Sequence, residues 1–249
     1  MAKKIVIFDL DGTLAESKST VTPAMVDSLK KLLARVNVAV VSGGAWPQFE
    51  SQLVSRLNLT PTESARLHLF PTSGTSFWKN PDGTGWTRVY SEDLTPEEVK
   101  RIFAAFRKVM DDPGVKMPTR FWGDVLENRG TQVTFSAMGQ LAPVEEKKKW
   151  DPKFAKRLVL MEKLVALLPE FDVRTGGSTS IDVTRKGIDK KYAVEQIEKY
   201  LGFTRPEMVF VGDAIFPGGN DYAVKAAGVD CVETSGPDDT LRIIDEILK

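Results

Sequence analysis

Two aspartates separated by a single leucine follow a short apolar run near the N-terminus, Ile5–Phe8. Side chains alternate along an extended chain, so Asp9 and Asp11 project to the same side if the run forms a strand. Carboxylates this close repel each other unless a cation lies between them. Mg²⁺ prefers oxygen ligands of this kind. A carboxylate can also act as a nucleophile or transfer a proton, so the pair predicts a metal-assisted reaction centre.

Short apolar, β-branched runs recur toward both ends of the chain and alternate with helical patterns. The runs are Ile5–Phe8, Val38–Val41, Met208–Val211 and Val229–Val232. Runs of this length and composition are typical of buried parallel strands. Their alternation with helices predicts an α/β fold with a doubly wound parallel sheet.

Polar residues follow these runs at the places where ligands bind. Ligands of open parallel sheets lie outside the carboxyl ends of the strands. Four groups are expected there: Asp9 with Asp11, Ser42 with Gly43, Lys190 at the start of a helix, and Asp213 with Asn220 and Asp221. A single aspartate after a strand is often only a turn former, but four groups in matching positions favour a site. Oxygen ligands suit Mg²⁺, and the predicted ligands are Asp9, Asp11, Asp213, Asn220 and Asp221.

The same groups are suited to a phosphate. The Ser42 hydroxyl, the backbone N–H of Gly43 and the charge of Lys190 are expected to hold its oxygens. Asp9 is then predicted to attack phosphorus and form an aspartyl-phosphate. Asp11 is predicted to serve the metal through its backbone carbonyl and to keep its carboxyl for proton transfer.

The middle of the chain has a different pattern, with amphipathic strands and two long helices. One helix is expected to begin at the capping box Thr95-Pro-Glu-Glu98 and the other after Asp151-Pro152. Alternation puts Gln132, Thr134 and Ser136 of one strand, and Ser178, Ser180 and Asp182 of another, on a polar face, which is expected to be exposed to water. We therefore predict an inserted α+β domain at 84–186, between core segments 1–83 and 187–249. The charged run at 145–151 is expected to be a solvated loop.

Composition excludes several function classes. Lys plus Arg and Asp plus Glu both number 34, so no overall field favours nucleic acid or an anionic membrane. No signal peptide or membrane span is expected. Cys231 is the only cysteine, which excludes an internal disulfide. His68 is the only histidine, and the other members that catalysis by a Ser-His or Cys-His pair needs are missing. A cytoplasmic location is expected.

These motifs together resemble those of the haloacid dehalogenase (HAD) superfamily. Asp9-Leu-Asp-Gly-Thr13 is similar to its first motif, Ser42 to the second, Lys190 to the third, and Asp213 with Asp221 to the fourth. The insert resembles the C2-type cap of subfamily IIB. The segments ENRGTQVTFSAMGQ and GGSTSIDVTRKGIDKKY resemble the eukaryotic-type phosphomannomutases and the Cof/sucrose-phosphatase type of sugar-phosphate phosphatases.

The resemblance implies Mg²⁺-dependent phosphoryl transfer through an aspartyl-phosphate. Hydrolysis of a sugar phosphate or a similar small phosphoester is the expected outcome, and interconversion of mannose 6-phosphate and mannose 1-phosphate is the alternative. It also implies a homodimer through the cap.

The resemblance also implies roles for cap residues. Arg129 and Arg120 would bind the substrate phosphate remote from the chemistry, with Ser180 and Asp182 contacting it or the sugar. For Ser180 and Asp182, an equal alternative to substrate binding is that they lie on a solvated outer face of the sheet. Gln140 stands where the mutases carry a further arginine, and an amide does not replace the guanidinium fork.

Overall fold

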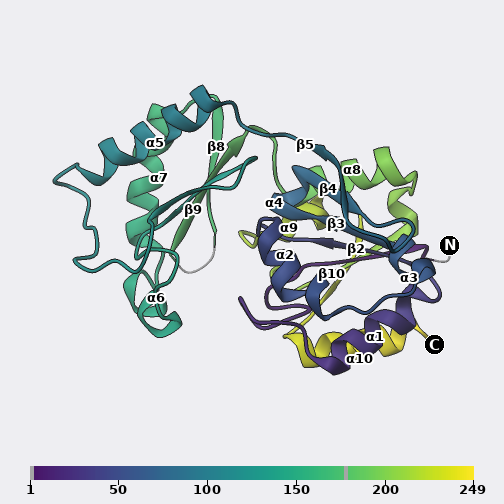
Figure 1. The fold of residues 1–249 in the computed structure, drawn as a ribbon. Helices are drawn as coiled ribbons and strands as arrows, with labels where there is room; N and C mark the ends of the chain where they lie inside the picture. The colour runs from purple at the N-terminus through teal and green to yellow at the C-terminus, as the bar shows by residue number, and fades with distance from the viewer. Residues whose placement is uncertain (1–2, 177–178) are drawn as a thin grey trace. The chain divides into compact units, whose positions relative to one another are not determined.

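The computed structural model describes residues 3–176 and 179–249, and the chain divides into two compact units (Figure 1). The core unit comprises Met1–Ser91 and Asp189–Lys249, and the inserted unit comprises Glu92–Ile188. None of the helices in the described residues is both long and apolar enough to span a membrane.

The core unit is built on a seven-stranded sheet with the order β11-β10-β1-β2-β3-β4-β5. The first five strands in that order are parallel, and β4 and β5 are antiparallel to their neighbours. The predicted doubly wound parallel sheet is confirmed. The strands are β1 (Ile5–Phe8), β2 (Asn37–Val41), β3 (Leu67–Phe70), β4 (Ser76–Lys79), β5 (Thr87–Ser91), β10 (Met208–Gly212) and β11 (Asp230–Glu233).

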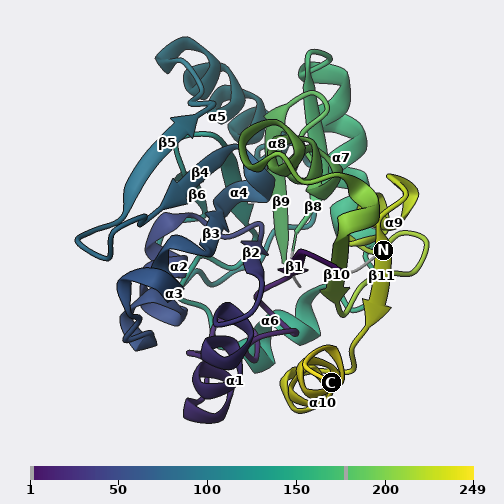
Figure 2. The same cartoon turned by 90° about the vertical axis from the view of Figure 1, so that its right-hand side faces the viewer.

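Helices cover both faces of this sheet. Figure 2 shows α1 and α10 on one side of the parallel strands and α8 on the other. Strand β1 accordingly buries both faces, because Val6 and Phe8 belong to one apolar cluster and Ile5 and Ile7 to another. The helices are α1 (Pro23–Leu33), α2 (Trp46–Gln52), α3 (Pro61–Ala65), α4 (Pro71–Gly74), α8 (Lys190–Leu201), α9 (Tyr222–Ala226) and α10 (Pro237–Ile247), with 3₁₀ turns η1 (Val54–Arg56) and η2 (Arg205–Glu207).

Local signals explain where several core helices begin and end. The Thr22 side chain accepts a hydrogen bond from the Met25 N–H at 3.2 Å, and proline starts α1 at its first position. Gly202 ends α8 in the left-handed conformation, with a φ of 75°.

The boundary of the insert differs from the sequence prediction of 83/84. Strand β5 pairs with β4 in the core sheet, so the boundary falls after Ser91. Because β5 has one strand neighbour and is largely exposed, its pattern is that of an edge strand, and alternation alone does not tell which sheet an edge strand joins. The return boundary, after Ile188, lies within two residues of the predicted 187.

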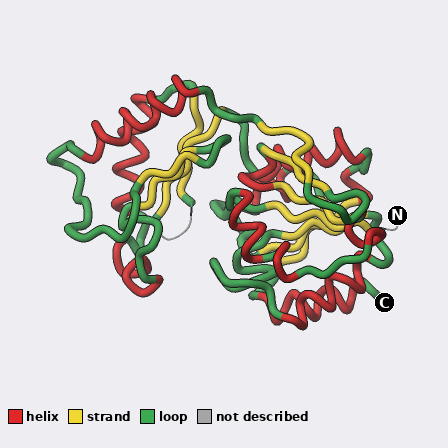
Figure 3. The backbone as a smooth tube through the Cα atoms, viewed as in Figure 1, coloured by secondary structure: helices red, strands yellow, loops and turns green. Residues whose placement is uncertain are grey.

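The inserted unit holds a four-stranded antiparallel sheet with the order β6-β7-β9-β8. In Figure 3 the long helices α5 and α7 lie on one face of these strands. Their apolar side chains form its core, in which the rings of Phe106 and Phe135 stack with centroids 5.3 Å apart. The predicted capping box at Thr95 and Glu98 is present. The elements are α5 (Pro96–Met110), β6 (Leu126–Asn128), β7 (Val133–Ser136), α6 (Val144–Trp150), α7 (Ala155–Leu167), β8 (Phe171–Thr175) and β9 (Ser180–Arg185).

The opposite, polar face of this sheet was predicted to be exposed to water, and that prediction is wrong for β7. Gln132, Thr134 and Ser136 are all buried. The Gln132 amide donates to Thr134 Oγ1 at 2.8 Å, and the Thr134 hydroxyl donates to Asp182 Oδ1 at 2.7 Å. Polar groups that satisfy one another in this way can be buried at low cost. Ser178 lies outside the described residues.

The charged run at 145–151 was predicted to be a solvated loop, but it forms most of helix α6. The helix buries Trp150 against the core of the unit and Lys147, whose ammonium donates to the Gln140 carbonyl at 3.0 Å. Glu146 and Lys149 form an i,i+3 ion pair at 3.2 Å on its surface. Alternating charges three residues apart thus support a helix here.

Candidate active site

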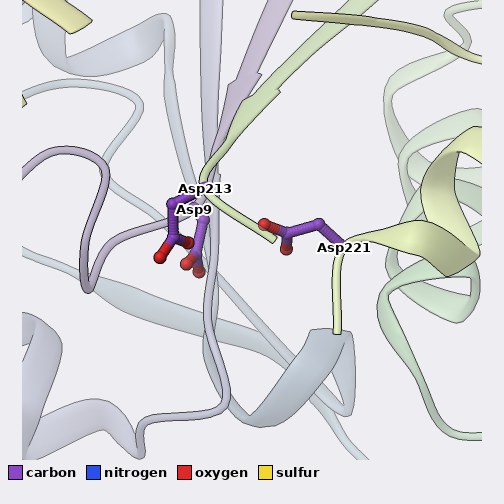
Figure 4. A group of neighbouring side chains, drawn as sticks. All are labelled: Asp9, Asp213 and Asp221. Atoms are coloured by element: carbon purple, nitrogen blue, oxygen red, sulfur yellow. The ribbon is translucent and has the colours of Figure 1, made fainter. Parts of the chain in front are cut away.

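Three aspartates of the core unit form an acidic cluster at the carboxyl ends of β1 and β10. One carboxylate oxygen from each of Asp9, Asp213 and Asp221 lies within 4.8 Å of the others. Figure 4 shows the carboxylates of Asp9 and Asp213 next to each other and that of Asp221 directed toward them. Asp9 and Asp221 are buried and Asp213 is exposed. The structure thus brings together three of the five predicted metal ligands.

Backbone hydrogen bonds fix two members of the cluster. The Asp9 N–H donates to the Val211 carbonyl at 3.0 Å, which extends the pairing of β1 with β10 by one residue. Asp221 precedes α9, and its Oδ2 accepts the Ala214 N–H at 3.1 Å. The loop after β10 is therefore folded back onto Asp221, next to Asp213.

Lys190, the first residue of α8, places a buried cation in this cluster. Its Nζ lies 2.7 Å from Asp9 Oδ1 and also contacts Asp221 Oδ1. Asp189 caps the helix, because its side chain accepts the Lys191 N–H at 2.8 Å. An ammonium or a carboxylate buried alone would be strongly destabilising, so the buried Lys190 and the two buried aspartates stabilise one another.

Burial and mutual charge shift the pKa values of these groups. Burial raises the pKa of Asp9 to about 7, against the opposing charge of Lys190. Burial also raises the pKa of Asp213, and the charge of Asp221 adds to that effect. Burial lowers the pKa of Lys190, but the charges of Asp9 and Asp221 outweigh it and the net shift is upward.

The donor set fits a divalent cation. When all three carboxylates are ionised, they and the one ammonium carry a net charge of minus two. Carboxylate oxygens are hard ligands, and a doubly charged hard cation balances that charge. Gly12 allows the close approach of the first loop: its φ is 83°, and a Cβ at this position would lie 2.5 Å from Asp213 Oδ2.

The carboxyl group of Asp11 lies in different surroundings from that of Asp9. Its Oδ1 accepts the Lys18 N–H at 2.7 Å and Gln52 Nε2 at 3.3 Å, and its Oδ2 accepts Gln48 Nε2 at 2.6 Å. Among the described residues the acidic cluster does not include this carboxylate. This arrangement is compatible with the predicted use of the Asp11 backbone carbonyl for the metal, which stays a prediction.

The loop after β2 carries the predicted phosphate ligands. Ser42 is buried, and its Oγ accepts the Gly44 N–H at 3.2 Å. Next to Gly43 there is open space, since a Cβ there would have nothing within 4 Å. The short helix α4 after β3 supports this loop, because the Ser73 N–H donates to the Ser42 carbonyl at 2.8 Å. Ser73 has a φ of 56°, which is uncommon for a residue other than glycine.

Asn220 immediately precedes Asp221, and its side chain is exposed. Chain position therefore brings it near the acidic cluster, while its role as a metal ligand stays a prediction.

The predicted ligands in the inserted unit form two groups. Arg129 is near Asp182: burial raises the pKa of Asp182, whereas the Thr134 hydrogen bond and the charge of Arg129 oppose that rise. Arg129 Nε also donates to Glu127 Oε2 at 2.8 Å. Ser180 and Asp182 are half-buried and two residues apart on β9, so they share a face of the sheet.

Arg120 lies in the second group. Its guanidinium stands 4.5 Å from the centroid of the Trp122 ring. Both residues line a cavity of about 550 Å³ with Met138 and Glu146, and the lining contains none of Arg129, Ser180 and Asp182. The cavity that Arg120 lines is therefore not formed by the other three predicted ligands.

Sequence reasoning missed Gln48 and Gln52, the side chains that hold Asp11. Their i,i+4 spacing on a short helix directly after the Ser42 loop was the available signal.

Solved structures share this fold. A haloacid dehalogenase-like hydrolase from Bacteroides thetaiotaomicron matches with a TM-score of 0.66 and 16% identity, over 98% of this chain and 99% of that chain. The Plasmodium falciparum IMP-nucleotidase matches with a TM-score of 0.72 and 15% identity, over 99% of this chain and 61% of that chain. The chain thus has the fold of the haloacid dehalogenase-like hydrolases, as its motifs predicted.

The particular family follows from sequence comparison. The chain belongs to the eukaryotic phosphomannomutase family, whose model matches residues 25–249. A phosphomannomutase of Encephalitozoon cuniculi (strain GB-M1) is 30% identical over 261 aligned residues, which cover 99% of this chain and 94% of the relative. A phosphomannomutase of Dendrobium officinale is 28% identical and covers 95% of this chain and 90% of its own length. The predicted family resemblance is confirmed.

Proposed function

We propose that this protein transfers the phosphoryl group of a sugar phosphate, or of a similar small phosphoester, to Asp9, and that water then releases it as phosphate. The observation that carries the proposal is the cluster of Asp9, Asp213 and Asp221 around the buried ammonium of Lys190. Membership of the eukaryotic phosphomannomutase family supports the same chemistry.

The residues of the core unit have distinct roles in this proposal. Asp9 attacks phosphorus in line with the departing oxygen, and the positive charge of Lys190 stabilises the negative charge of the phosphoryl oxygens. The Ser42 hydroxyl and the Gly43 backbone hold those oxygens. Asp11 gives a proton to the departing oxygen and later takes one from the attacking water.

Mg²⁺ is the proposed cofactor. Asp9, Asp213 and Asp221 would hold it, with Asn220 and the Asp11 carbonyl as further predicted ligands. When bound, the ion neutralises charge on the phosphoryl oxygens as the reaction proceeds. Chelation by EDTA is expected to abolish turnover, and added Mg²⁺ is expected to restore it.

The inserted unit is proposed to bind the rest of the substrate. Arg129 offers a guanidinium from the turn between β6 and β7, and Ser180 and Asp182 offer polar atoms on β9, which pairs with β7. Arginine binds phosphate through a planar fork of donors. Arg120 stays a prediction for this role.

Interconversion of mannose 6-phosphate and mannose 1-phosphate is the second candidate function, and family membership favours it. Both functions share the transfer to Asp9 and differ in whether water or the sugar takes the phosphoryl group away. Gln140 favours the phosphatase, because its amide does not supply the arginine fork and its Nε2 is buried with no hydrogen-bond partner among the described residues.

One experiment separates the two candidates. The protein is incubated with Mg²⁺, mannose 1-phosphate and a trace of glucose 1,6-bisphosphate, and both mannose 6-phosphate and free phosphate are followed. Phosphate without isomer supports the phosphatase, whereas isomer without phosphate supports the mutase. A panel of phosphorylated metabolites with Mg²⁺ extends the test, and absence of turnover on every member would reject phosphoryl transfer.

A homodimer through the cap and a cytoplasmic location stay predictions. Sedimentation velocity tests the first, and cell fractionation tests the second.

A further inference from the structure

The Asp11 carboxyl group is held by two glutamines of one short helix. Gln48 and Gln52 lie four residues apart on α2, so they share a helix face. Gln48 Nε2 donates to Asp11 Oδ2 at 2.6 Å, and Gln52 Nε2 donates to Asp11 Oδ1 at 3.3 Å. Gln52 is itself fixed, because it is buried and its Nε2 also donates to the Ser19 carbonyl at 2.7 Å.

The two oxygens of this carboxyl group are not equivalent. Each carboxylate oxygen has two lone pairs for hydrogen bonds. Oδ1 accepts two donors, the Lys18 N–H and Gln52 Nε2, whereas within residues 3–176 and 179–249 Oδ2 accepts only Gln48 Nε2. Oδ2 therefore keeps one lone pair that can hold or receive a proton, while its other lone pair is fixed by Gln48.

The loop after β2 is shaped around the same glutamine. A Cβ at position 44 would lie 2.3 Å from Gln48 Oε1, so Gly44 leaves the room that the amide occupies. The Gly44 N–H is in turn held by Ser42 Oγ at 3.2 Å. Gln48 thus connects the predicted phosphate loop with the predicted proton-transfer group.

We propose that Gln48 is a positioning residue that fixes the Asp11 carboxyl group so that Oδ2 is the oxygen that transfers the proton. The proposal rests on the proposed function. In the first half-reaction a bond forms between Asp9 and phosphorus, the bond between phosphorus and the departing oxygen breaks, and that oxygen takes the proton from Asp11 Oδ2. In the second, Oδ2 takes a proton from water as the water oxygen bonds to phosphorus and the bond to Asp9 breaks.

This role has a signature that a merely structural contact lacks. A departing group that is a strong base needs a proton as its bond to phosphorus breaks, whereas a weakly basic one leaves without it. Misplacing the Asp11 carboxyl should therefore slow phenyl phosphate, whose leaving group is basic, much more than dinitrophenyl phosphate. Damage to folding or to the metal ligands would slow both esters equally.

The test compares Gln48→Met, which keeps the chain length but removes the donor, with wild type on both esters in Mg²⁺. The Gln48→Met change is expected to lower kcat/KM about 10–100-fold for phenyl phosphate and less than about 3-fold for dinitrophenyl phosphate. Gln48→Leu, which is uncharged and also lacks the N–H donors, should show the same selective loss. Glu50→Gln, at an exposed position of the same helix, should match wild type on both esters.

Equal losses on the two esters in both Gln48 variants, or no loss on either, would overturn the positioning role while leaving the phosphatase in place. Turnover of neither ester by wild type, with no phosphate released from any sugar phosphate, would instead reject the proposed function and this role with it.

Discussion

The ammonium of Lys190 lies 2.7 Å from Oδ1 of Asp9, and both side chains are buried. The same ammonium contacts Asp221, so one cation serves two of the three clustered carboxylates. This contact fixes the proposed nucleophile on one side and leaves the cluster with the charge that a divalent ion balances.

Replacing Lys190 with methionine is expected to lower kcat/KM by about 100-fold or more, because the phosphoryl charge loses a fixed positive partner in a buried site. The neighbouring residue Lys191 is exposed, so Lys191→Met is the matched control and should retain wild-type activity. Steady-state assays with p-nitrophenyl phosphate provide the measurement. A Lys190→Met enzyme as active as the control would contradict the proposed role.

A second prediction concerns Gly12. Gly12→Ala meets two obstacles: a φ of 83°, and a Cβ that would lie 2.5 Å from Asp213 Oδ2. The backbone strain is expected to cost about 1–2 kcal/mol of stability. Displacement of Asp213 should in addition weaken Mg²⁺ binding, measured by titration calorimetry on the protein without substrate.

Gly187 provides the control for that variant. Its φ is 82°, but a Cβ there would meet nothing within 4 Å. Gly187→Ala should therefore show a similar loss of stability in urea unfolding with unchanged Mg²⁺ affinity. If both variants bind Mg²⁺ like wild type, the contact between Gly12 and Asp213 does not shape the metal site.

The buried histidine should make stability depend on pH. Burial lowers the pKa of His68 to about 4, and the charge of Lys79 on the neighbouring strand adds to the shift. The folded pKa is below the unfolded value of about 6.5, so the folded state binds fewer protons between these values. Stability is thus fully present above pH 6.5 and falls as the pH decreases toward 4, by about 3 kcal/mol in total.

His68→Gln isolates this contribution from that of the carboxylates, which titrate in the same range. Urea unfolding of both proteins across this pH range gives the measurement, and wild type should lose more stability on acidification than the variant. Parallel stability curves would show that His68 is not responsible.

Sequence reasoning located the acidic cluster because its positions follow from local patterns. Asp9 and Asp213 directly follow two neighbouring strands, and Lys190 begins the helix whose capping signal precedes it. The place of Arg120 against the Trp122 ring was not predictable, because it depends on how the chain before β6 folds. The hydrogen bond from Gln48 to Asp11 is a tertiary contact, and the i,i+4 spacing of Gln48 and Gln52 alone does not say which group they hold.

In the fold, too, features set by local sequence patterns were predicted, and features set by tertiary contacts were not. Strand β1, which is buried on both faces, has a continuous apolar sequence and was predicted with its correct bounds, and β2 and β10 each extend one residue beyond the predicted run. Edge strand β5 was assigned to the inserted unit, but it pairs with β4 in the core sheet. The residue pattern of β5 does not show which strand it pairs with. The polar face of β7 was expected to be exposed to water. Its burial depends on the hydrogen bond between Thr134 and Asp182, which the sequence does not show.

The central claim is that Asp9 accepts the phosphoryl group, and its most direct test is the detection of that bond. The protein is mixed with Mg²⁺ and substrate and quenched in acid, and its peptides are examined by mass spectrometry. We predict a phosphoryl group on Asp9 in wild type and none in Asp9→Asn, which should also lose turnover. Turnover in wild type with the phosphoryl group on another residue, or undiminished turnover in Asp9→Asn, would contradict the account.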